Sequence, residues 1–599
     1  MISDLLELYS FLQSAHKRKL IYIQAFIFFM AFAELVTVFS IVPFMAIVAD
    51  PTLIETNEIF IFAFSFINSP FLEDNLIFYL GIFVVIAILF STLISIITVW
   101  YINIQAQRIG YELASSLYLN YMNESWTFHT LNHSSKLTNK IMNEASRLTS
   151  HIINPILQIN ARLVVVIFIV GGLIIASPSV AILSVIIFAV AYFIIFNLIR
   201  SKLAKNGKIL TFEQEKRIKL INDGFGGIKD TLILGRQNFF VSQFFDASNK
   251  VARAGAINQA LSQIPRYALE FLAFTGLVSI VLTFYVVNDG NINAILPIVS
   301  LFAIAAFKLL PAFQILFNSV SMIQGNISAI HSIKNDLNSA SGIIEQNLQN
   351  SFKKLTFNES ITFKGISFTY PGKNSPALTD INITIPKNHK IALVGPSGSG
   401  KSTMIDILLG LIRPSEGIIE VDGVSMSKSK IRDFQNNIGF VPQSTFLSDA
   451  SIMENIAFGL PIKKINNNSI QECIKLARLD EFIDSLPDGL YTMIGERGVQ
   501  ISGGQKQRIS IARALYNDAE LLVFDEATSA LDGNTESKVM NEINNLAKSK
   551  TIVLVAHRLS TVKTCDCIYF FDNGRIIDYG TFSELLEKNI SFRKMAAKS

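Results

Sequence analysis

The sequence predicts a membrane protein in two parts, an all-helical domain of six membrane-crossing segments followed by a soluble α/β domain. Three observations predict this fold class. The 599 residues are 50% hydrophobic and only 16% charged, with a mean hydropathy of +0.41, a composition typical of membrane proteins. Long apolar stretches fill residues 1–320. After Phe352, short β-rich runs alternate with helical ones, as in α/β domains.

Six apolar stretches are long enough to cross a bilayer. A helix needs about 20 apolar residues to span roughly 30 Å of hydrocarbon. The stretches lie near residues 20–48, 76–104, 154–177, 180–199, 267–287 and 292–318. No short apolar segment with a small-residue cleavage site opens the chain, so we expect the first stretch to stay in the membrane. We therefore predict a transmembrane domain over residues 1–335.

Basic residues concentrate in every second connection between the predicted spans, and therefore on one side of the membrane. They concentrate before the first stretch, after the second and after the fourth, as at Lys17, Arg108 and Arg200. The connection 50–75 carries five acidic residues and no basic one, and the two remaining connections are short and lack basic residues. Because Lys and Arg accumulate in cytoplasmic loops, we expect both termini and the α/β domain in the cytoplasm.

The two long basic connections are rich in helix formers, which indicates that the spans continue as helices beyond the bilayer. At their tips, WTFH (126–129) and GFGGIKD (224–230) are typical of short docking helices, with plain solvated turns as the alternative. A stretch rich in Ser, Asn and Gln then predicts a linker at 336–351, followed by the α/β domain at 352–599.

Charge and cysteine content exclude other classes of protein. The net charge is only +4, and the basic residues flank apolar segments, so we expect no nucleic-acid partner. Three cysteines, an odd number, suit a reducing compartment without disulfides. Cys565-Asp-Cys567 resembles half of a metal site, but no second pair lies nearby, so two free thiols are the better interpretation.

The clearest motif of the α/β domain is GPSGSGKST. An apolar strand, 391–394, precedes it and a helical run, 404–411, follows, which is the context that a P-loop requires. The backbone N–H groups of such a loop face phosphates at a helix N-terminus. We expect Lys401 to reach the β- and γ-phosphates of ATP and Ser402 to ligate Mg²⁺. The expected ATP-binding residues are Gly395, Pro396, Ser397, Gly398, Ser399, Gly400, Lys401, Ser402 and Thr403.

Five further side chains lie close to predicted strands and complete this chemistry. In LLVFDE, Asp525 is expected to hold Mg²⁺ and Glu526 to act as the general base, whereas without a P-loop the pair would be a solvated strand end. Gln443 is expected to bind Mg²⁺ and sense the γ-phosphate. His557 would reach the same phosphate, although a lone His after a strand is usually a surface residue. Tyr370 can stack on adenine, which spacing alone does not decide.

A second anion site lies at Ser502-Gly503-Gly504-Gln505. It precedes the helical run KQRISIARAL and therefore forms another helix N-terminus suited to a phosphate. The chain's own P-loop already accounts for its own nucleotide. A second anion site without a second P-loop therefore indicates that it closes on the ATP of another copy of the chain.

These motifs resemble those of ABC ATPases, in their order along the chain. The resemblance assigns Tyr370 to the A-loop, Gly395–Thr403 to Walker A, Gln443 to the Q-loop, Glu496 to the X-loop, Ser502–Gln505 to the signature, Asp525 and Glu526 to Walker B, Ser529–Asp532 to the D-loop and His557 to the H-loop. It implies a homodimer in which two ATP molecules lie head to tail, both hydrolysed because Glu526 and His557 are present. Ile501 stands where the family usually has Leu, a mild change.

Six spans followed by one such ATPase resemble a half-size ABC exporter of the bacterial inner membrane. The resemblance implies that ATP binding turns the helices outward and that hydrolysis resets them. The six spans argue against a non-transport ATPase acting on ribosomes or DNA.

Charged residues near the spans bear on the cargo, because each costs free energy in lipid unless it faces a cavity or a partner. Arg266 and Lys308 are candidates to hold an anionic head group such as pyrophosphate, and Glu34 is a third candidate cavity residue. The alternatives are snorkelling and a Glu34–Lys308 pair. The segment 57–68 is either an interfacial helix that shields a lipid tail or a packed loop helix.

Three stretches, FAELVTVFSIVPFMAIVAD, IPRYALE and FKLLPA, resemble the lipid-linked oligosaccharide flippases of the PglK type. The resemblance implies transfer of a polyprenyl-pyrophosphate glycan to the periplasmic leaflet, with Arg266 and Lys308 in a cationic belt. Ser91 stands where another Arg is expected in that belt. A lipid A, lipid or multidrug exporter, with a less cationic cavity, and a peptide exporter remain alternatives.

Overall fold

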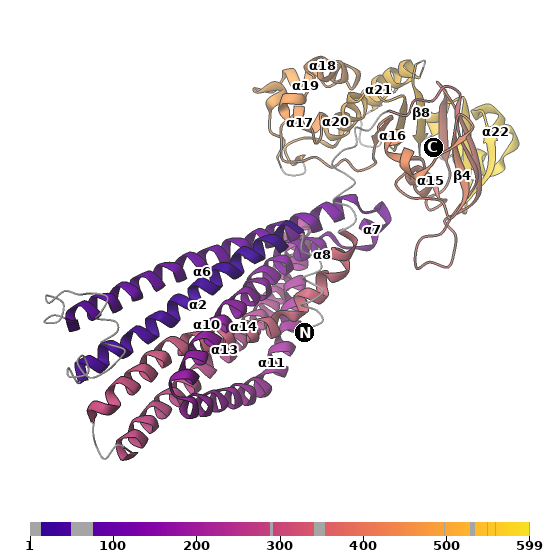
Figure 1. Ribbon diagram of the computed structural model, residues 1–599. Coiled ribbons are helices and arrows are strands. Elements are labelled where there is room, and N and C mark those ends of the chain that lie inside the picture. The colour runs from indigo at the N-terminus through magenta and orange to yellow at the C-terminus, as the bar shows by residue number, and fades with distance from the viewer. Residues whose placement is uncertain are drawn as a thin grey trace. The chain divides into compact units, whose positions relative to one another are not determined.

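The computed structural model describes residues 14–49, 76–287, 292–340, 354–495, 498–526, 533–547, 549–556 and 559–597. The chain divides into two compact units (Figure 1). The first holds residues 1–124 and 128–348, and the second holds 349–599 together with 125–127. The first unit is all-helical and the second is an α/β domain, which confirms the predicted fold class.

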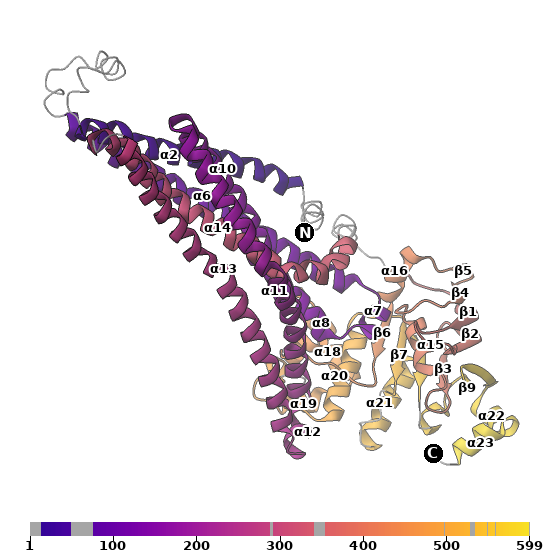
Figure 2. The ribbon, with the colours of Figure 1, turned by 90° about the horizontal axis from the view of Figure 1, so that it is seen from below.

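Six helical runs of the first unit are long and apolar enough to cross a membrane. The main helices of these runs are α2 (Ser14–Ala49), α6 (Leu76–Asn123), α10 (Asn154–Ala176), α11 (Pro178–Gly226), α13 (Gln237–Val287) and α14 (Ile292–Ala340). Both views show these long helices running lengthwise beside one another (Figures 1 and 2). Helix α11 has 49 residues and is therefore about 70 Å long, more than twice the hydrocarbon thickness. The predicted continuation of the spans as helices is confirmed.

Short helices occupy the connections between the long ones. Helices α7 (Trp126–Leu131) and α12 (Ile228–Ile233) lie at the two tips where docking helices are predicted, and their docking role stays a prediction. Helix α10 continues a helical run that begins with α8 (Ser134–Asn139) and includes α9 (Ala145–Leu148) and two π-helical turns, Lys140–Glu144 and Thr149–Ile153. The segment 57–68 lies outside the described residues.

Helix α10 is almost wholly apolar, but one of its faces is buried in the helical domain and the other is exposed. Residues at intervals of four along one stripe are at most 8% exposed: Leu157, Ala161, Val165, Ile169 and Leu173. This stripe belongs to the core that α10 shares with α2 and α14. Ile167 and Ile175, which lie off the stripe, are 58% and 86% exposed within the single chain. Because both faces are apolar, a bilayer solvates the exposed face without a free-energy cost.

The second unit is built on two sheets. Strands β1 (Ser360–Phe368), β2 (Leu378–Pro386), β4 (Glu416–Val421) and β5 (Val424–Ser425) form an antiparallel sheet in the order β2-β1-β4-β5. The larger sheet has the order β10-β9-β3-β8-β7-β6. It contains β3 (Lys390–Val394), β6 (Ile438–Val441), β7 (Leu521–Asp525), β8 (Thr551–Val555), β9 (Cys567–Asp572) and β10 (Arg575–Gly580), and all neighbours pair in parallel except β9 with β10.

Helices and short helical turns complete this unit. The helices are α15 (Lys401–Leu408), α16 (Ile431–Gln435), α17 (Ile452–Ile456), α18 (Asn467–Leu476), α19 (Asp480–Asp484), α20 (Gly503–Tyr516), α21 (Gly533–Leu546), α22 (Phe582–Lys588) and α23 (Ile590–Ala596). The 3₁₀ turns are Lys428–Lys430, Ile462–Lys464, Gly489–Tyr491 and Leu559–Val562.

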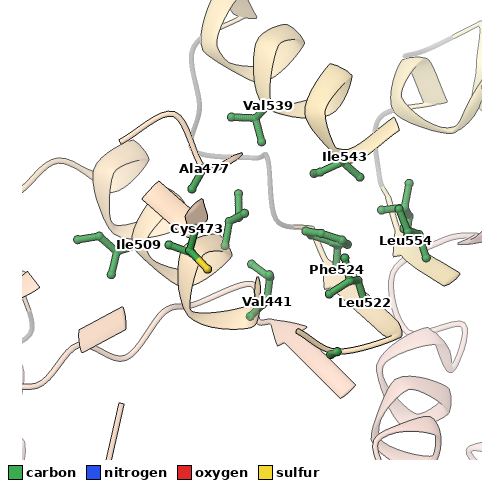
Figure 3. Close-up of a cluster of buried hydrophobic side chains, with 14 of the residues drawn as sticks. Val441, Cys473, Ala477, Ile509, Leu522, Phe524, Val539, Ile543 and Leu554 are labelled. Atoms are coloured by element: carbon green, nitrogen blue, oxygen red, sulfur yellow. The ribbon is translucent and has the colours of Figure 1, made fainter. Parts of the chain in front are cut away.

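Alternate residues of the central strands enter two different cores, because successive strand side chains point to opposite faces of a sheet. Leu522 and Phe524 of β7 pack with helices α18, α20 and α21 on one face. Figure 3 shows Leu522 and Phe524 next to each other in the cluster that includes Val539 and Ile543 of α21. Leu521 and Val523 instead join the core that contains α15 and the antiparallel sheet. The parallel strands are thus covered on both faces, and their parallel pairing brings their carboxyl ends to one edge of the sheet.

Candidate functional site

The functional side chains lie at the carboxyl edge of the larger sheet. Strand β8 pairs with β3 on one side and with β7 on the other, and β6 pairs with β7. The GPSGSGKST loop follows β3, Asp525 ends β7 with Glu526 next to it, and Gln443 follows β6. Parallel strands bring these segments to a common edge, which is where ligands bind in open α/β sheets. Three segments far apart in the sequence therefore build one site.

The phosphate loop depends on glycine where the backbone passes close to other atoms. Gly395 has a φ of +154°, and a Cβ there would lie 2.1 Å from the carbonyl oxygen of Phe571. Gly400, with a φ of +102°, immediately precedes the first residue of α15. Only glycine combines these backbone angles with such close approach. The loop thus directs its backbone toward the N-terminus of α15, the end of a helix that favours anions.

Lys401 is held inside this loop. Its side chain is 5% exposed, and its Nζ donates to the carbonyl oxygens of Gly395, at 2.9 Å, and Pro396, at 2.8 Å. Burial lowers the pKa of the ammonium group, while the carboxylates of Glu526 and Asp525 oppose that shift. The predicted phosphate-binding lysine therefore lies near the predicted general base, Glu526, and the predicted Mg²⁺ ligand, Asp525. Ser402 is exposed at the start of α15.

Tyr370 is tied to the same helix. Its hydroxyl is 3.1 Å from Oγ1 of Thr403, in α15. Its ring packs edge-on against Phe368, with ring centroids 4.9 Å apart. The side chain is half-buried, so part of it stays accessible beside the phosphate loop. This place is compatible with the predicted stacking on adenine, which remains a prediction.

Gln443 and Glu526 contact each other directly. The Nε2 of Gln443 donates to Oε2 of Glu526 at 2.8 Å. Glu526 has a φ of +50°, a left-handed conformation that is uncommon for a residue other than glycine. Its N–H donates to the carbonyl oxygen of Val555 in β8 at 3.0 Å. A strained backbone with a fixed side chain is common where a group must be held in one orientation.

The predicted second anion site forms a capped helix N-terminus. The Ser502 side chain accepts a hydrogen bond from the backbone N–H of Gln505, and the Gln505 side chain accepts one from the backbone N–H of Ser502 at 2.8 Å. Gly503 begins α20 and is exposed. The capping box stabilises the first turn and leaves the glycine backbone accessible. This geometry suits an anion that comes from outside the chain.

Two residues that the sequence did not single out connect these parts. Gln507, 4% exposed on α20, donates from Nε2 to the carbonyl oxygen of Glu526 at 3.3 Å. Arg513 of the same helix donates to the carbonyl oxygens of Phe446, at 2.9 Å, and Asn455, at 2.8 Å. Both follow the Ser502–Gln505 motif on the same helix, outside the residues to which the sequence assigns a role. Their polar character within a buried helix face is the only signal in the sequence.

The described residues include a set of hard oxygen donors suited to Mg²⁺. Ser402 offers a hydroxyl, Gln443 an amide oxygen and Asp525 a carboxylate, the ligand types that Mg²⁺ prefers. They fit the predicted role of binding the ion and offsetting phosphate charge. His557, Glu496 and the segment 529–532 lie outside the described residues, so their predicted roles stay predictions.

Glu34 has partners other than the one proposed as an alternative from the sequence. Its Oε1 accepts a hydrogen bond from the Ser95 hydroxyl at 3.2 Å and lies 3.8 Å from NH1 of Arg162. Glu34 is 5% exposed, and it makes no pair with Lys308 within the described residues. The Glu34–Lys308 pairing was therefore wrong. Ion pairing with Arg162 reduces the cost of burying Glu34 in the spans.

Arg266 is the centre of a separate polar cluster on α13 and α14. Its Nε is 2.6 Å from Oε1 of Glu270, and the same oxygen accepts a hydrogen bond from Gln314 Nε2 at 3.1 Å. The Arg266 side chain is 57% exposed within the chain. Lys308, half-buried on α14, makes no hydrogen bond or ion pair with the residues that the structure describes.

An apolar pocket of about 400 Å³ lies among α10, α11, α13 and α14. Its wall includes Leu173, Phe188 and Gly276. The hydroxyls of Ser184, Ser279 and Thr283 also reach the wall, and each donates to a carbonyl oxygen four residues earlier in its own helix, at 2.8 Å. Because these hydroxyls are already paired, the pocket presents mainly hydrocarbon. It is suited to an apolar chain.

Two protein families match separate parts of the chain. The family described as "ABC transporter" matches residues 378–529, and the "ABC transporter transmembrane region" matches residues 20–308. A solved structure entitled "Structure of a bacterial Atm1-family ABC exporter with ATP bound" aligns with a TM-score of 0.77 over 98% of this chain and 99% of that one. At 22% sequence identity, this likeness concerns the fold alone.

Several curated relatives are similar over part of their length. The ATP-dependent lipid A-core flippase of Wigglesworthia glossinidia brevipalpis is 44% identical over 38% of this chain and 39% of its own length. That of Methylobacillus flagellatus is 30% identical over 66% of both chains. The heterocyst differentiation ATP-binding protein HepA of Nostoc is 34% identical over 60% of this chain and 58% of its own length. The matches thus span about two fifths to two thirds of these relatives.

Proposed function

The chain belongs to the ABC transporter family and has the half-size exporter architecture, and from this premise we propose that two copies form an ATP-driven lipid flippase. Its cargo is a lipid with an anionic glycan head group, best represented by a polyprenyl-pyrophosphate oligosaccharide. The dimer moves this lipid from the cytoplasmic to the periplasmic leaflet of the bacterial inner membrane. The ATP-binding domains and both termini lie in the cytoplasm.

In this proposal ATP hydrolysis takes place at the carboxyl edge of the larger sheet. The 395–403 loop and Lys401 bind the phosphates, and Ser402, Gln443 and Asp525 would hold a Mg²⁺ ion that would neutralise the phosphate charge. Glu526 orients and deprotonates the attacking water, with its carboxylate fixed by Gln443 at 2.8 Å. The capped N-terminus of α20 binds the γ-phosphate of the partner's ATP. Two such contacts hold the dimer closed until hydrolysis removes the γ-phosphate.

The observation that carries the cargo proposal is the place of Arg266 beside the apolar pocket. Arg266 lies six residues, or about 9 Å of helix, before Leu272, the first residue of α13 on the pocket wall. Gln314 of the polar cluster directly follows Phe313, another wall residue. A polar cluster and a hydrocarbon pocket thus adjoin along the same two helices. This arrangement supports a ligand with a polar head and a long apolar tail.

The chemistry of Arg266 favours an anionic head group. Within the described residues, the hydrogen bond between Arg266 and Glu270 is made by Nε, and the two terminal nitrogens of the guanidinium are the donors that we assign to the head group. A guanidinium group binds phosphate through such paired N–H donors. Lys308 adds a second positive charge on α14. Because the tail passes from the hydrocarbon of the bilayer to a hydrocarbon wall, the pocket accommodates the tail without a large change in free energy.

A second candidate cargo is the lipid A-core itself. Two similar proteins are named ATP-dependent lipid A-core flippases, which favours this cargo independently of the pocket. Both candidates combine a glycan, an anionic group and hydrocarbon, so the same residues would serve either. They differ in the number and branching of their tails.

The decisive experiment reconstitutes the full-length protein in liposomes and measures ATP-dependent transfer of each labelled lipid between leaflets. We expect transfer of the polyprenyl-pyrophosphate oligosaccharide, and its loss in Glu526→Gln. Arg266→Gln combined with Lys308→Gln is expected to lower the number of lipids moved per ATP at least tenfold, because the head group loses its charged contacts.

Gly276 offers a matched test of the pocket. A Cβ at this position meets no atom within 4 Å, so a larger side chain enters open space. Gly276→Phe is expected to fill the pocket and lower transfer at least fivefold, whereas Gly276→Ala is expected to retain it. Transfer of lipid A-core alone would favour the second candidate. ATP hydrolysis without transfer of either lipid would contradict the flippase proposal.

A further inference from the structure

We propose that Gln507 is a positioning residue that links the two ATP sites of the dimer. It holds the backbone of Glu526 in its own chain, while the helix that carries it binds the ATP of the partner. The inference rests on the proposed homodimer and extends it, because it names a physical connection by which one site affects the other.

The first step concerns the place of Gln507 on α20. It lies four residues after Gly503, one helical turn from the exposed N-terminus that faces the partner's nucleotide in the proposed dimer. The side chain is 4% exposed, so its amide points into the domain, and Nε2 donates to the Glu526 carbonyl oxygen at 3.3 Å. A rigid helix thus joins an anion site at its end to a hydrogen bond on its buried face.

The second step concerns the backbone of Glu526. Its φ of +50° lies in the left-handed region, which a residue with a Cβ adopts only when surrounding contacts hold it there. Among the described residues, two backbone contacts support this conformation: the Glu526 N–H donates to Val555, and the Glu526 carbonyl oxygen accepts from Gln507. Because the backbone angles set the direction of the side chain, they also determine where the Glu526 carboxylate lies. Losing the Gln507 bond removes one of these two restraints.

The third step concerns how a movement of α20 changes the hydrogen bond between Gln507 and Glu526. At 3.3 Å the bond is already near the long limit of N–H···O geometry, so a shift of α20 by about 1 Å makes or breaks it. Binding of the partner's ATP at Ser502–Gln505 fixes the axial position of α20. That position tightens the bond of Gln507 to Glu526 and orients the general base toward the chain's own ATP. Closure of one site therefore prepares hydrolysis in the other.

The test separates this role from simple support of α20. Two differently tagged full-length chains are co-expressed and purified as mixed dimers in which one chain carries Glu526→Gln, so that a single site hydrolyses ATP. Gln507→Met, which keeps the side-chain length but removes the donor, is then placed on either chain. On the chain that keeps Glu526 it is expected to lower kcat about tenfold, the value of one hydrogen bond, with KM for ATP unchanged. On the other chain the loss is expected to be less than twofold.

Ser510→Ala provides a matched control on the same helix. Ser510 is fully buried, and within the described residues its Oγ has no hydrogen-bond partner, so the substitution is expected to change kcat less than twofold. In the plain homodimer, Gln507→Met is also expected to lower the Hill coefficient for ATP toward one. This second readout decides the question if mixed dimers prove inactive.

Two results would overturn the inference. An equal loss of kcat with Gln507→Met on either chain would mean that the residue supports the signature helix. An unchanged kcat and Hill coefficient in the homodimer would mean that it positions nothing. Failure to recover mixed dimers would instead contradict the proposed homodimer, and is therefore distinguishable from both kinetic results.

Discussion

At the scale of single residues, burial determines how charged groups of the ATP-binding domain behave. Asp406 lies on α15, just after the phosphate loop. Burial, and secondarily the nearby Asp525 carboxylate, raises the pKa of Asp406 to about 6. Both causes disfavour the ionised form, because charge loses hydration and meets a like charge. Asp406 therefore opposes folding once it is ionised.

This shift predicts how the stability of the domain depends on pH. The folded-state pKa lies above the unfolded value of about 3.9, so the folded state binds the proton more tightly, and stability falls as pH rises from about 4 to about 6. Asp406→Asn is expected to be more stable than the parent at pH 8, by no more than about 3 kcal/mol because residual water screens the charge. The difference is expected to vanish near pH 4.

Thermal unfolding of the full-length protein in detergent, followed across this pH range, measures the effect. Asp484→Asn, at an exposed site on α19, is the control and is expected to alter the pH dependence little. An Asp406→Asn protein whose advantage persists unchanged at pH 4 would contradict this account.

At the scale of elements, α17, α20 and the loop after β6 are joined by a buried amide. Asn455 on α17 is fully buried, and its Oδ1 accepts the Ser448 N–H at 2.9 Å. Its Nδ2 donates to the carbonyl oxygens of Ser448 and Ser451, both at 3.1 Å. Arg513 of α20 donates to the Asn455 carbonyl and lies over the Phe458 ring at 4.7 Å. The loop that contains Gln443 is therefore fixed to the helix that carries the signature.

Asn455→Ala is expected to destabilise the domain by about 2–4 kcal/mol, because it leaves buried backbone groups without hydrogen-bond partners. It is also expected to lower ATPase activity, since the Gln443 loop loses its support. Thermal unfolding and steady-state ATPase measurements on the full-length protein check both effects. Asn468→Ala, at an exposed position on α18, is the matched control and is expected to cost less than about 1 kcal/mol. Equal effects of the two substitutions would contradict the proposed role of the buried amide.

At the scale of the whole molecule, the proposed sites are shared between two chains. A chain with Lys401→Ala keeps its signature, and a chain with Ser502→Arg keeps its phosphate loop. Neither homodimer then has an intact composite site, but a mixed dimer has one. We expect both homodimers to be nearly inactive and the purified mixed dimer to be clearly active but below half of the parent ATPase rate, because α20 of the chain that hydrolyses ATP carries Ser502→Arg and binds no partner nucleotide.

Differential affinity tags isolate the mixed dimer for this measurement. A mixed dimer as inactive as its parents, although both variants bind one another, would argue against shared sites. Activity in the Ser502→Arg homodimer would show that the capped N-terminus of α20 is not required. The two results address different parts of the proposal.

Much of the fold and of the ATP site is predictable because its signals are local. The GPSGSGKST loop needs glycines at fixed positions. Gly395 shows why, because a Cβ at this position would collide with the Phe571 carbonyl oxygen. The six spans are visible because a bilayer demands long apolar runs. In both cases the physical requirement, a backbone geometry or an apolar solvent, is met by residues that are contiguous in the sequence.

The tertiary structure decided which polar residues meet. Glu34 pairs with Ser95 and Arg162, and Gln507 contacts Glu526, through positions far apart in the chain. The apolar pocket beside Arg266 likewise combines four helices. Sequence pattern does not reveal these contacts, because spans that are apolar nearly all round carry no periodicity to orient their faces. The sequence by itself therefore determined the spans, the α/β class and the ATP motifs, whereas packing decided how charges are paired and where a lipid tail fits.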